Sequence, residues 1–194
     1  ATDSVTVQLT SGAGALVGTT SVAAVDGVAS FPGLTVEVAG SGEEGRAGSG
    51  WRSRGVRTPF AVSPAAAAAL AFAQQPTDIA AGAAFDPVIA VRLQDAYGNV
   101  VTSATDSVGL QLTTGTGSLT GTTTVAAVEG IASFPGLTIE TAGSGKQVTA
   151  TSGVLTSAVS DTFAVSPAAA VTLAFAQQPT AVVAGATISP AVTV

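Results

Sequence analysis

"VIAVRLQDAYGNVV" (residues 88–101) carries the two signals from which the fold can be predicted. In its first half, Ile89, Val91 and Leu93 recur at every second position, which is the period of a β-strand with one buried face. Its second half, Asp-Ala-Tyr-Gly-Asn, holds the residue types of a tight turn, because Gly tolerates positive φ and Asp and Asn bond to nearby backbone. The stretch therefore predicts a half-buried strand that ends in a hairpin turn.

The same alternation recurs on either side of this stretch. In "SVGLQLT" (107–113), Val108, Leu110 and Leu112 fall on one face. Turn sequences rich in Gly, Asn and Asp separate the alternating segments. Seven or more short strands in about 100 residues predict an all-β fold, an antiparallel β-sandwich of the immunoglobulin-like type. Further strands are expected at 70–72, 122–128, 132–134, 137–139, 148–150 and 163–165.

The sequence repeats itself at an offset of 103 residues. At this offset, 31 of the 42 residues in 1–42 and 21 of the 33 in 59–91 have an identical partner, but only 4 of the 16 in 43–58 do. Such a period is too long for a solenoid repeat and has the length of an independently folding module. The sequence thus predicts tandem modules, and residues separated by this offset are called equivalent below.

Ala-rich "SPAAA" segments, at 63–67 and 166–170, lie where successive modules join. We expect residues 65–167 to be a complete repeat, residues 1–64 the C-terminal part of a preceding repeat, and residues 168–194 the N-terminal strands of a following one. The favoured interpretation is a segment of a longer array. The alternative is that 168–194 of one copy fills the incomplete sandwich of 1–64 in another, which builds a filament by donor-strand exchange.

The composition excludes several classes of function. The chain contains no His, Cys or Met, which removes most transition-metal ligation, thiol catalysis and any Ser-His-Asp triad. The net charge of −6 disfavours binding to nucleic acid, and no apolar run is long enough for membrane insertion. We therefore expect no catalytic residues and no cofactor.

Asp95 and Asn99 are the candidate calcium ligands, through carboxylate and carbonyl oxygens. The loop lacks a second carboxylate, and the same residues are what a tight turn needs, so the structural interpretation is favoured and no metal is expected. Tyr97, between them, is a candidate for ligand binding. An isopeptide bond between Lys146 and Asn99 is disfavoured, because Glu43 replaces Lys146 in the preceding repeat.

"EEGRAGSGWRSRGVRT" (43–58) differs from its surroundings and holds four of the five arginines and the single tryptophan. Three interpretations are open: a frame slip in the gene that is restored near Phe60, an arginine-rich binding loop that uses Trp51, Arg52 and Arg54, or neutral divergence. Gly45 stands where the later repeat has Val148, so we expect the strand at 43–49 to be absent or poorly paired.

Several short motifs follow one another in a specific order. A strand ends in the D-x-x-G-N-x-V pattern of residues 95–101, and G-x-x-x-F (130–134), L-x-I (137–139) and T-A-T-S (149–152) follow. In this order and tandem arrangement, residues 65–167 resemble the bacterial immunoglobulin-like repeats of the invasin/intimin group.

The resemblance implies a non-catalytic stalk or fibre module of an extracellular adhesin on the bacterial cell surface, whose partners are neighbouring repeats. The receptor is not indicated by the sequence. An alternative function is binding of a glycan or a host protein through loops at one end of the sandwich.

Overall fold

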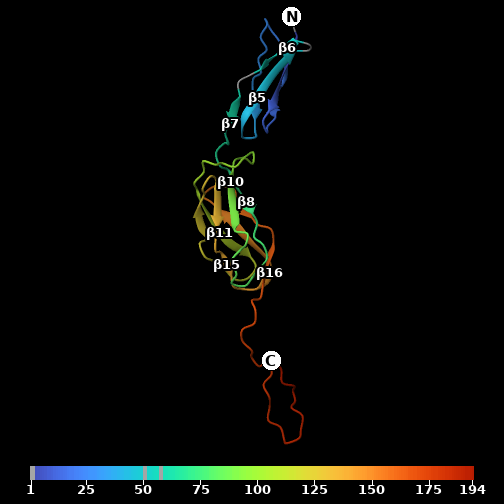
Figure 1. The fold of residues 1–194 in the computed structure, drawn as a ribbon, viewed down its shortest axis with the longest axis vertical. Coiled ribbons are helices and arrows are strands. Elements are labelled where there is room, and N and C mark those ends of the chain that lie inside the picture. The colour runs from blue at the N-terminus through green and yellow to red at the C-terminus, as the bar shows by residue number, and fades with distance from the viewer. Residues whose placement is uncertain (1–2, 50–51, 57–58) are drawn as a thin grey trace.

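The computed structural model describes residues 3–49, 52–56 and 59–194, with the side chains of 52–56 left undescribed. Over these residues the chain is all-β: strands and turns occur, and no helix does. Accordingly, no described segment is a helix of the length and apolarity that would cross a membrane. The molecule is elongated, with the N-terminal strands at one end, a larger body in the middle and residues 168–194 at the other end (Figure 1).

Five of the described N-terminal strands form one antiparallel sheet, in the order β3-β1-β5-β6, with β7 also paired to β5. Strand β5 is central to it, because it pairs with β1 on one edge and with β6 and β7 on the other. A separate two-stranded ladder joins β2 to β4. The strands are β1 (Ser4–Ser11), β2 (Leu16–Val17), β3 (Ser21–Ala23), β4 (Thr35–Val36), β5 (Gly40–Ser49), β6 (Arg52–Val56) and β7 (Phe60–Val62).

The middle body contains two larger sheets. One has the order β14-β10-β8, and the other has the order β13-β11-β16-β18-β9, with β17 paired to β16 and a parallel contact between β18 and β9. A short ladder joins β12 to β15. The strands are β8 (Ala69–Gln74), β9 (Ile79–Ala80), β10 (Ile89–Gln94), β11 (Ser107–Thr114), β12 (Leu119–Thr120), β13 (Thr124–Ala126), β14 (Ile131–Phe134), β15 (Thr138–Ile139), β16 (Gly143–Thr151), β17 (Ala158–Val159) and β18 (Phe163–Ser166).

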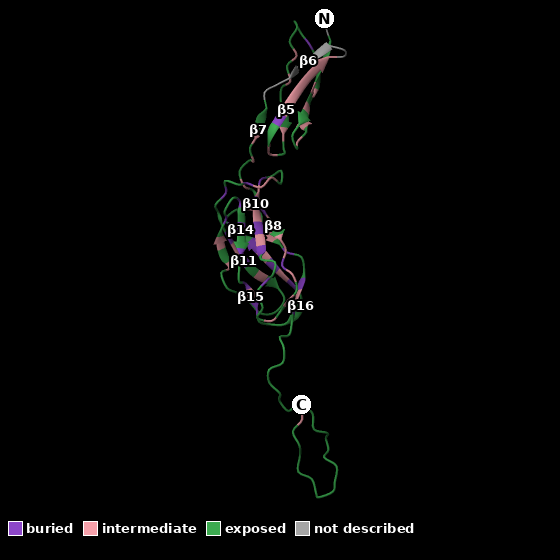
Figure 2. Cartoon of the chain, in the orientation of Figure 1, coloured by how far each residue is buried: buried purple, intermediate pink, exposed green. Residues whose placement is uncertain are grey.

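The hydrophobic core lies in this body, and its members all come from residues 67–165. The predicted inward residues of β10, Ile89, Val91 and Leu93, are fully buried, which confirms the alternation that the sequence showed. The rings of Phe85 and Phe163 meet edge to face with centroids 5.4 Å apart. Buried residues are concentrated here, whereas the C-terminal segment is exposed along nearly all of its length (Figure 2).

Strand pairing in the N-terminal sheet has the same register as in the body. In β1 and β5, Thr6 faces Gly48, and the equivalent residues of β11 and β16, Gly109 and Thr151, face each other too. In both pairs the register shifts at the corresponding place near the end of the ladder.

The expectation that residues 43–49 would lose their strand is therefore wrong. Strand β5 is present and pairs as regularly as β16. The physical reason is that ladder hydrogen bonds join backbone groups, so a change of side chain does not remove them. What changes is packing: Val148 and Ala150 are fully buried, whereas Gly45 and Ala47 are half-buried.

One strand of the body has no counterpart among the described N-terminal strands. Residues 131–134 form β14 by pairing with β10, but the equivalent residues 28–31, although nearly identical, are not a strand beyond a single bridge at Val28. No described segment occupies the position of β10 beside them. Whether this sequence becomes a strand thus depends on its partner.

Candidate functional site

The turn at residues 95–99 contains a network of hydrogen bonds. The backbone N–H of Asp95 donates to the Asn99 carbonyl at 3.0 Å, and that of Gly98 donates to the Asp95 carbonyl at 3.1 Å. Gly98 has a φ of 87°, which a glycine adopts without steric cost. Oδ1 of Asp95 accepts from the N–H groups of Tyr97 and Asn99, both at 2.9 Å.

The second carboxylate oxygen of Asp95 connects this turn to the segment that enters β8. Oδ2 accepts from the backbone N–H of Ala65 and from Nδ2 of Asn99, each at 2.9 Å. Asp95 is only 3 % exposed, so these bonds are formed where water contributes little. The turn is thereby attached to the chain just after β7.

Asn99 extends the network to the N-terminal strands. Its Nδ2 donates to the carbonyl of Glu37 at 2.7 Å, and its Oδ1 accepts from the N–H of Ala39 at 2.9 Å. A primary amide offers one acceptor and two donors, so a single Asn can pair with a backbone segment as another strand would. We call Asp95, Asn99, Ala65 and the backbone of 37–39 the joint.

The electrostatics of the joint follow from these bonds. Burial raises the pKa of Asp95, but the bond from the Asn99 side chain and three from backbone N–H groups outweigh burial and lower the pKa from 3.8 to about 2. Asp95 is therefore ionised at neutral pH, and its negative charge strengthens all four bonds.

The joint uses the atoms that a calcium ion would need. Each Asp95 oxygen already accepts two N–H donors, and Oδ1 of Asn99 accepts one. Elsewhere in the described part of the chain, no three acidic side chains gather into a possible metal site. The structural interpretation of the turn therefore accounts for both carboxylate oxygens of Asp95 and for the side-chain amide of Asn99.

The remaining candidate residues do not converge with the joint. Tyr97 is 60 % exposed, and only its backbone N–H takes part in the network. Trp51 lies outside the described residues. Arg52 and Arg54 belong to β6, at the far end of the N-terminal sheet (Figure 1).

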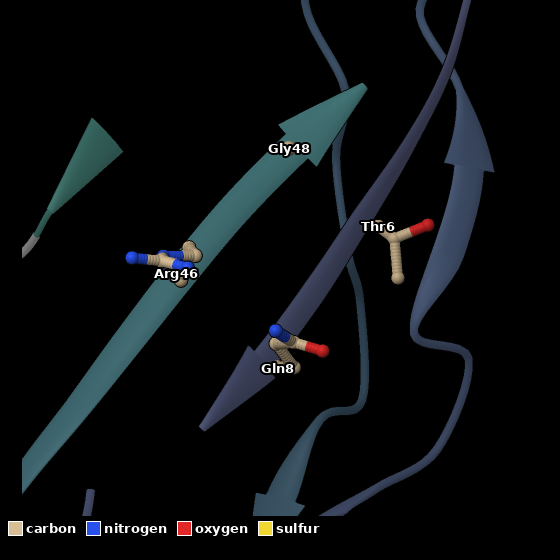
Figure 3. A pocket seen from close by; sticks show the side chains of 4 residues that line it. All are labelled: Thr6, Gln8, Arg46 and Gly48. Atoms are coloured by element: carbon tan, nitrogen blue, oxygen red, sulfur yellow. The ribbon is translucent and has the colours of Figure 1, made fainter. Parts of the chain in front are cut away.

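One described arginine of the divergent segment, Arg46, borders an open hollow of about 270 Å³. Figure 3 shows its side chain on β5 beside Gln8 and Thr6 of β1, with Gly48 further along. Gln8 is directly opposite Arg46 in the ladder. The hollow contains one cationic group and two neutral polar side chains on the exposed face, which is a small set for selective recognition of a ligand.

Lys146 and its equivalent in the N-terminal sheet, Glu43, lie in separate places, and both side chains are fully buried. Nζ of Lys146 donates to the carbonyl of Thr116 at 2.5 Å. Oε1 of Glu43 accepts from the N–H of Ala13 at 3.2 Å, but Oε2 is buried without a partner. Nζ of Lys146 and Nδ2 of Asn99, the two ends of the disfavoured isopeptide bond, donate to different carbonyls, those of Thr116 and Glu37.

Comparisons with known proteins give no family. No protein-family model matches the chain, and no curated protein does. Among solved structures, the chain is similar to a beta-glycosidase from Bacteroides vulgatus, at 15 % identity and a TM-score of 0.43 over 81 % of this chain and 21 % of that one. It is also similar to two structures of Parabacteroides merdae beta-glucuronidase, at 17 % identity and a TM-score of 0.38 over 81 % of this chain and 21 % or 20 % of theirs. The chain spans about a fifth of the length of these enzymes.

Sequence reasoning identified Asp95 and Asn99 as a turn but missed the joint. The one available signal was that Asn99 is the single asparagine of the chain. Nothing in the sequence of 37–39 indicates a partner, because the groups that bind Asn99 are backbone atoms. The described residues define a class, an all-β protein with a polar joint between two groups of strands.

Proposed function

We propose that this chain is a non-catalytic structural segment of a bacterial extracellular or cell-surface array. In this proposal it is built from tandem immunoglobulin-like β-sandwich repeats similar to those of the invasin/intimin group. Residues 65–167 are one repeat, 1–64 are the later part of the repeat before it, and 168–194 are the first strands of the next. Its partners are neighbouring repeats.

The joint is the observation that carries the proposal. Asn99 binds the backbone of 37–39, and Asp95 binds the N–H of Ala65, so one turn holds both the strands before the connection and the connection itself. A stalk needs such contacts, because a short connection without them acts as a hinge, and interfaces between domains otherwise permit relative motion. The matching strand registers of β1 with β5 and of β11 with β16 support the repeat.

The absence of catalysis is part of the proposal. Neither His nor Cys is available as a general base or nucleophile. The two buried acids make structural contacts: Asp95 belongs to the joint, and Oε1 of Glu43 accepts from the N–H of Ala13, while its Oε2 has no partner among the described residues. Most of the other residues are Ala, Val, Thr, Gly and Ser, a composition that suits a structural module.

The test is the substitution Asn99→Ala in the full chain, with Tyr97→Ala as the matched control. Small-angle scattering should show a broader range of shapes for Asn99→Ala, because its three side-chain bonds to Glu37, Ala39 and Asp95 are lost. Tyr97→Ala changes the same turn but leaves these bonds, so its scattering should match the unmodified chain. Identical scattering from all three proteins would contradict the proposal that the joint restricts motion between the two groups of strands.

A further inference from the structure

Residues 140–142 of the body are the equivalents of 37–39, the backbone segment that Asn99 binds in the joint. In both places a short strand, β4 or β15, ends just before the segment, and a long strand, β5 or β16, begins with the residue after it. The chain bends at the middle residue of each segment. The first residue of each long strand pairs with the last strand of its repeat, β7 or β18. The two segments are therefore placed in the same way between their strands.

The polar groups of the two segments differ in whether they have a partner. The Glu37 carbonyl and the Ala39 N–H bind the side chain of Asn99. No other described residue bonds to the equivalent groups, the Glu140 carbonyl and the Ala142 N–H. Ala39 is half-buried, whereas the whole segment in the body is exposed. Both groups of the body thus lie on an accessible segment and lack the amide that their equivalents bind.

A third group of the joint is also present a second time. The N–H of Ala65 donates to Oδ2 of Asp95. Its equivalent, Ala168, is exposed, and its N–H bonds to no other described residue. The three backbone groups that one turn binds in the joint therefore recur together, at the end of the body from which residues 168–194 leave it (Figure 1).

We propose that Glu140, Ala142 and Ala168 form a docking site for the Asp-x-x-Gly-Asn turn of the repeat that follows the body. The Asn amide of that turn donates to the Glu140 carbonyl and accepts from the Ala142 N–H. Its Asp carboxylate accepts from the Ala168 N–H. The inference rests on the function proposed above, because it takes residues 168–194 as the start of that repeat, and it adds the atoms by which that repeat is held.

The chemistry of the site favours this occupant. A carbonyl and an N–H two residues apart match one primary amide, which carries both a donor and an acceptor. Because only backbone atoms of the site are used, Thr141 can replace Val38 between the bonded residues without changing the contact. The same Ser-Pro-Ala-Ala-Ala sequence follows Val62 and Val165, so the following repeat starts at the same distance from its site.

A contact that recurs at each junction gives successive repeats one constant relative placement. Each repeat is then turned by the same amount against the repeat before it, so the array is regular along its length.

The test keeps the full chain and continues it. Because Val194 is the equivalent of Val91, a copy of residues 92–167 added after Val194 completes the next repeat. An isotope label in residues 1–194 alone keeps their amides distinct from those of the identical copy in NMR spectra. Hydrogen exchange is measured in the extended chain, in the extended chain with Asn99→Ala in the copy alone, and in a matched control with Tyr97→Ala in the copy alone.

We expect the Ala142 amide to exchange about tenfold more slowly in the extended chain than in the unextended one, because a hydrogen-bonded amide exchanges only when its contact opens. Asn99→Ala in the copy should abolish this slowing, since the amide side chain is lost. Tyr97→Ala in the copy should leave it unchanged, because in the joint Tyr97 contributes only its backbone N–H.

Equally fast exchange at Ala142 with and without the copy overturns the proposal, and so does slowing that survives Asn99→Ala in the copy. A second sample, labelled in the copy alone, shows whether the copies of β11 and β16 exchange slowly. A copy that does not fold also overturns the proposal, because no repeat then follows at this register.

The Ala39 amide reports the existing joint in the same spectra. Fast exchange at Ala39 is evidence against the function proposed above, because Asn99 then does not hold the strands before the connection. Slow exchange at Ala39 together with fast exchange at Ala142 is a failure of the docking site alone.

Discussion

Asp95 makes the stability of the joint depend on pH. Its pKa is about 2 in the folded chain against 3.8 for the free group, so the folded state binds the proton less readily than the unfolded state does. The stabilisation is therefore fully present above pH 3.8 and is lost as the pH falls toward about 2.

The substitution Asp95→Asn should remove that pH dependence. Thermal unfolding followed by circular dichroism is expected to show a smaller loss of stability between neutral and acidic pH in this variant than in the unmodified chain. Asp161→Asn, at an exposed position, serves as the control and should keep the original profile. An unchanged profile in Asp95→Asn would show that its carboxylate bonds are not coupled to folding.

Glu43 and Lys146 permit a reciprocal exchange at equivalent positions. In Glu43→Lys, a buried oxygen without a partner disappears, and the new ammonium can donate to the Ala13 carbonyl as Lys146 donates to that of Thr116. An unsatisfied buried polar group costs about 1–3 kcal/mol, so we expect slower hydrogen exchange in β1 and β5. In Lys146→Glu, exchange in β11 and β16 should become faster. Faster exchange in Glu43→Lys would contradict this account.

At the scale of the element, the turn before β14 shows what a neighbouring strand adds. Gly130 and its equivalent Gly27 have φ values of 75° and 80°. A Cβ on Gly130 would lie 2.5 Å from the Val101 carbonyl oxygen, whereas a Cβ on Gly27 would meet nothing within 4 Å. The two positions therefore share a conformational restriction but differ in packing.

Alanine substitutions at these glycines should have unequal effects. Gly27→Ala is expected to cost about 1–2 kcal/mol through the left-handed conformation alone. Gly130→Ala should cost about 1–3 kcal/mol more, since the backbone at Val101 must move. Chemical unfolding, with hydrogen exchange to assign each loss to its strands, measures the difference. Equal losses would show that the contact with Val101 is relieved without cost.

At the scale of the whole molecule, the distribution of the core predicts how the chain unfolds. Every member of the main hydrophobic cluster lies between 67 and 165, so residues 65–167 expressed alone should fold cooperatively into a β-protein. In the full chain at low concentration, hydrogen exchange should be slowest in β10, β11 and β16, and fastest in 168–194. A fragment of residues 65–167 without a cooperative transition would contradict the assignment of this unit.

Much of the body could be predicted from local pattern. The alternation in "VIAVRLQ" correctly places Ile89, Val91 and Leu93 in the core, and the turn at 95–99 lies where Gly and Asn indicate it. Such signals are readable because strand period and turn chemistry depend on neighbouring residues. At β5 the side-chain pattern gave a wrong prediction, a missing or poorly paired strand. The backbone of β5 pairs with β1 although Gly45 and Ala47 contribute little to a core.

The sequence alone therefore determined the strand period, the turns and the offset at which the chain repeats itself. Only the tertiary structure decided which equivalent residues are buried, that 131–134 but not 28–31 is a strand, and that Asn99 binds the backbone of 37–39. The physical reason is that burial and strand pairing depend on segments distant in the chain. Equivalent sequences differ in structure here because covering strands lie beside 131–134, whereas no described strand lies beside 28–31.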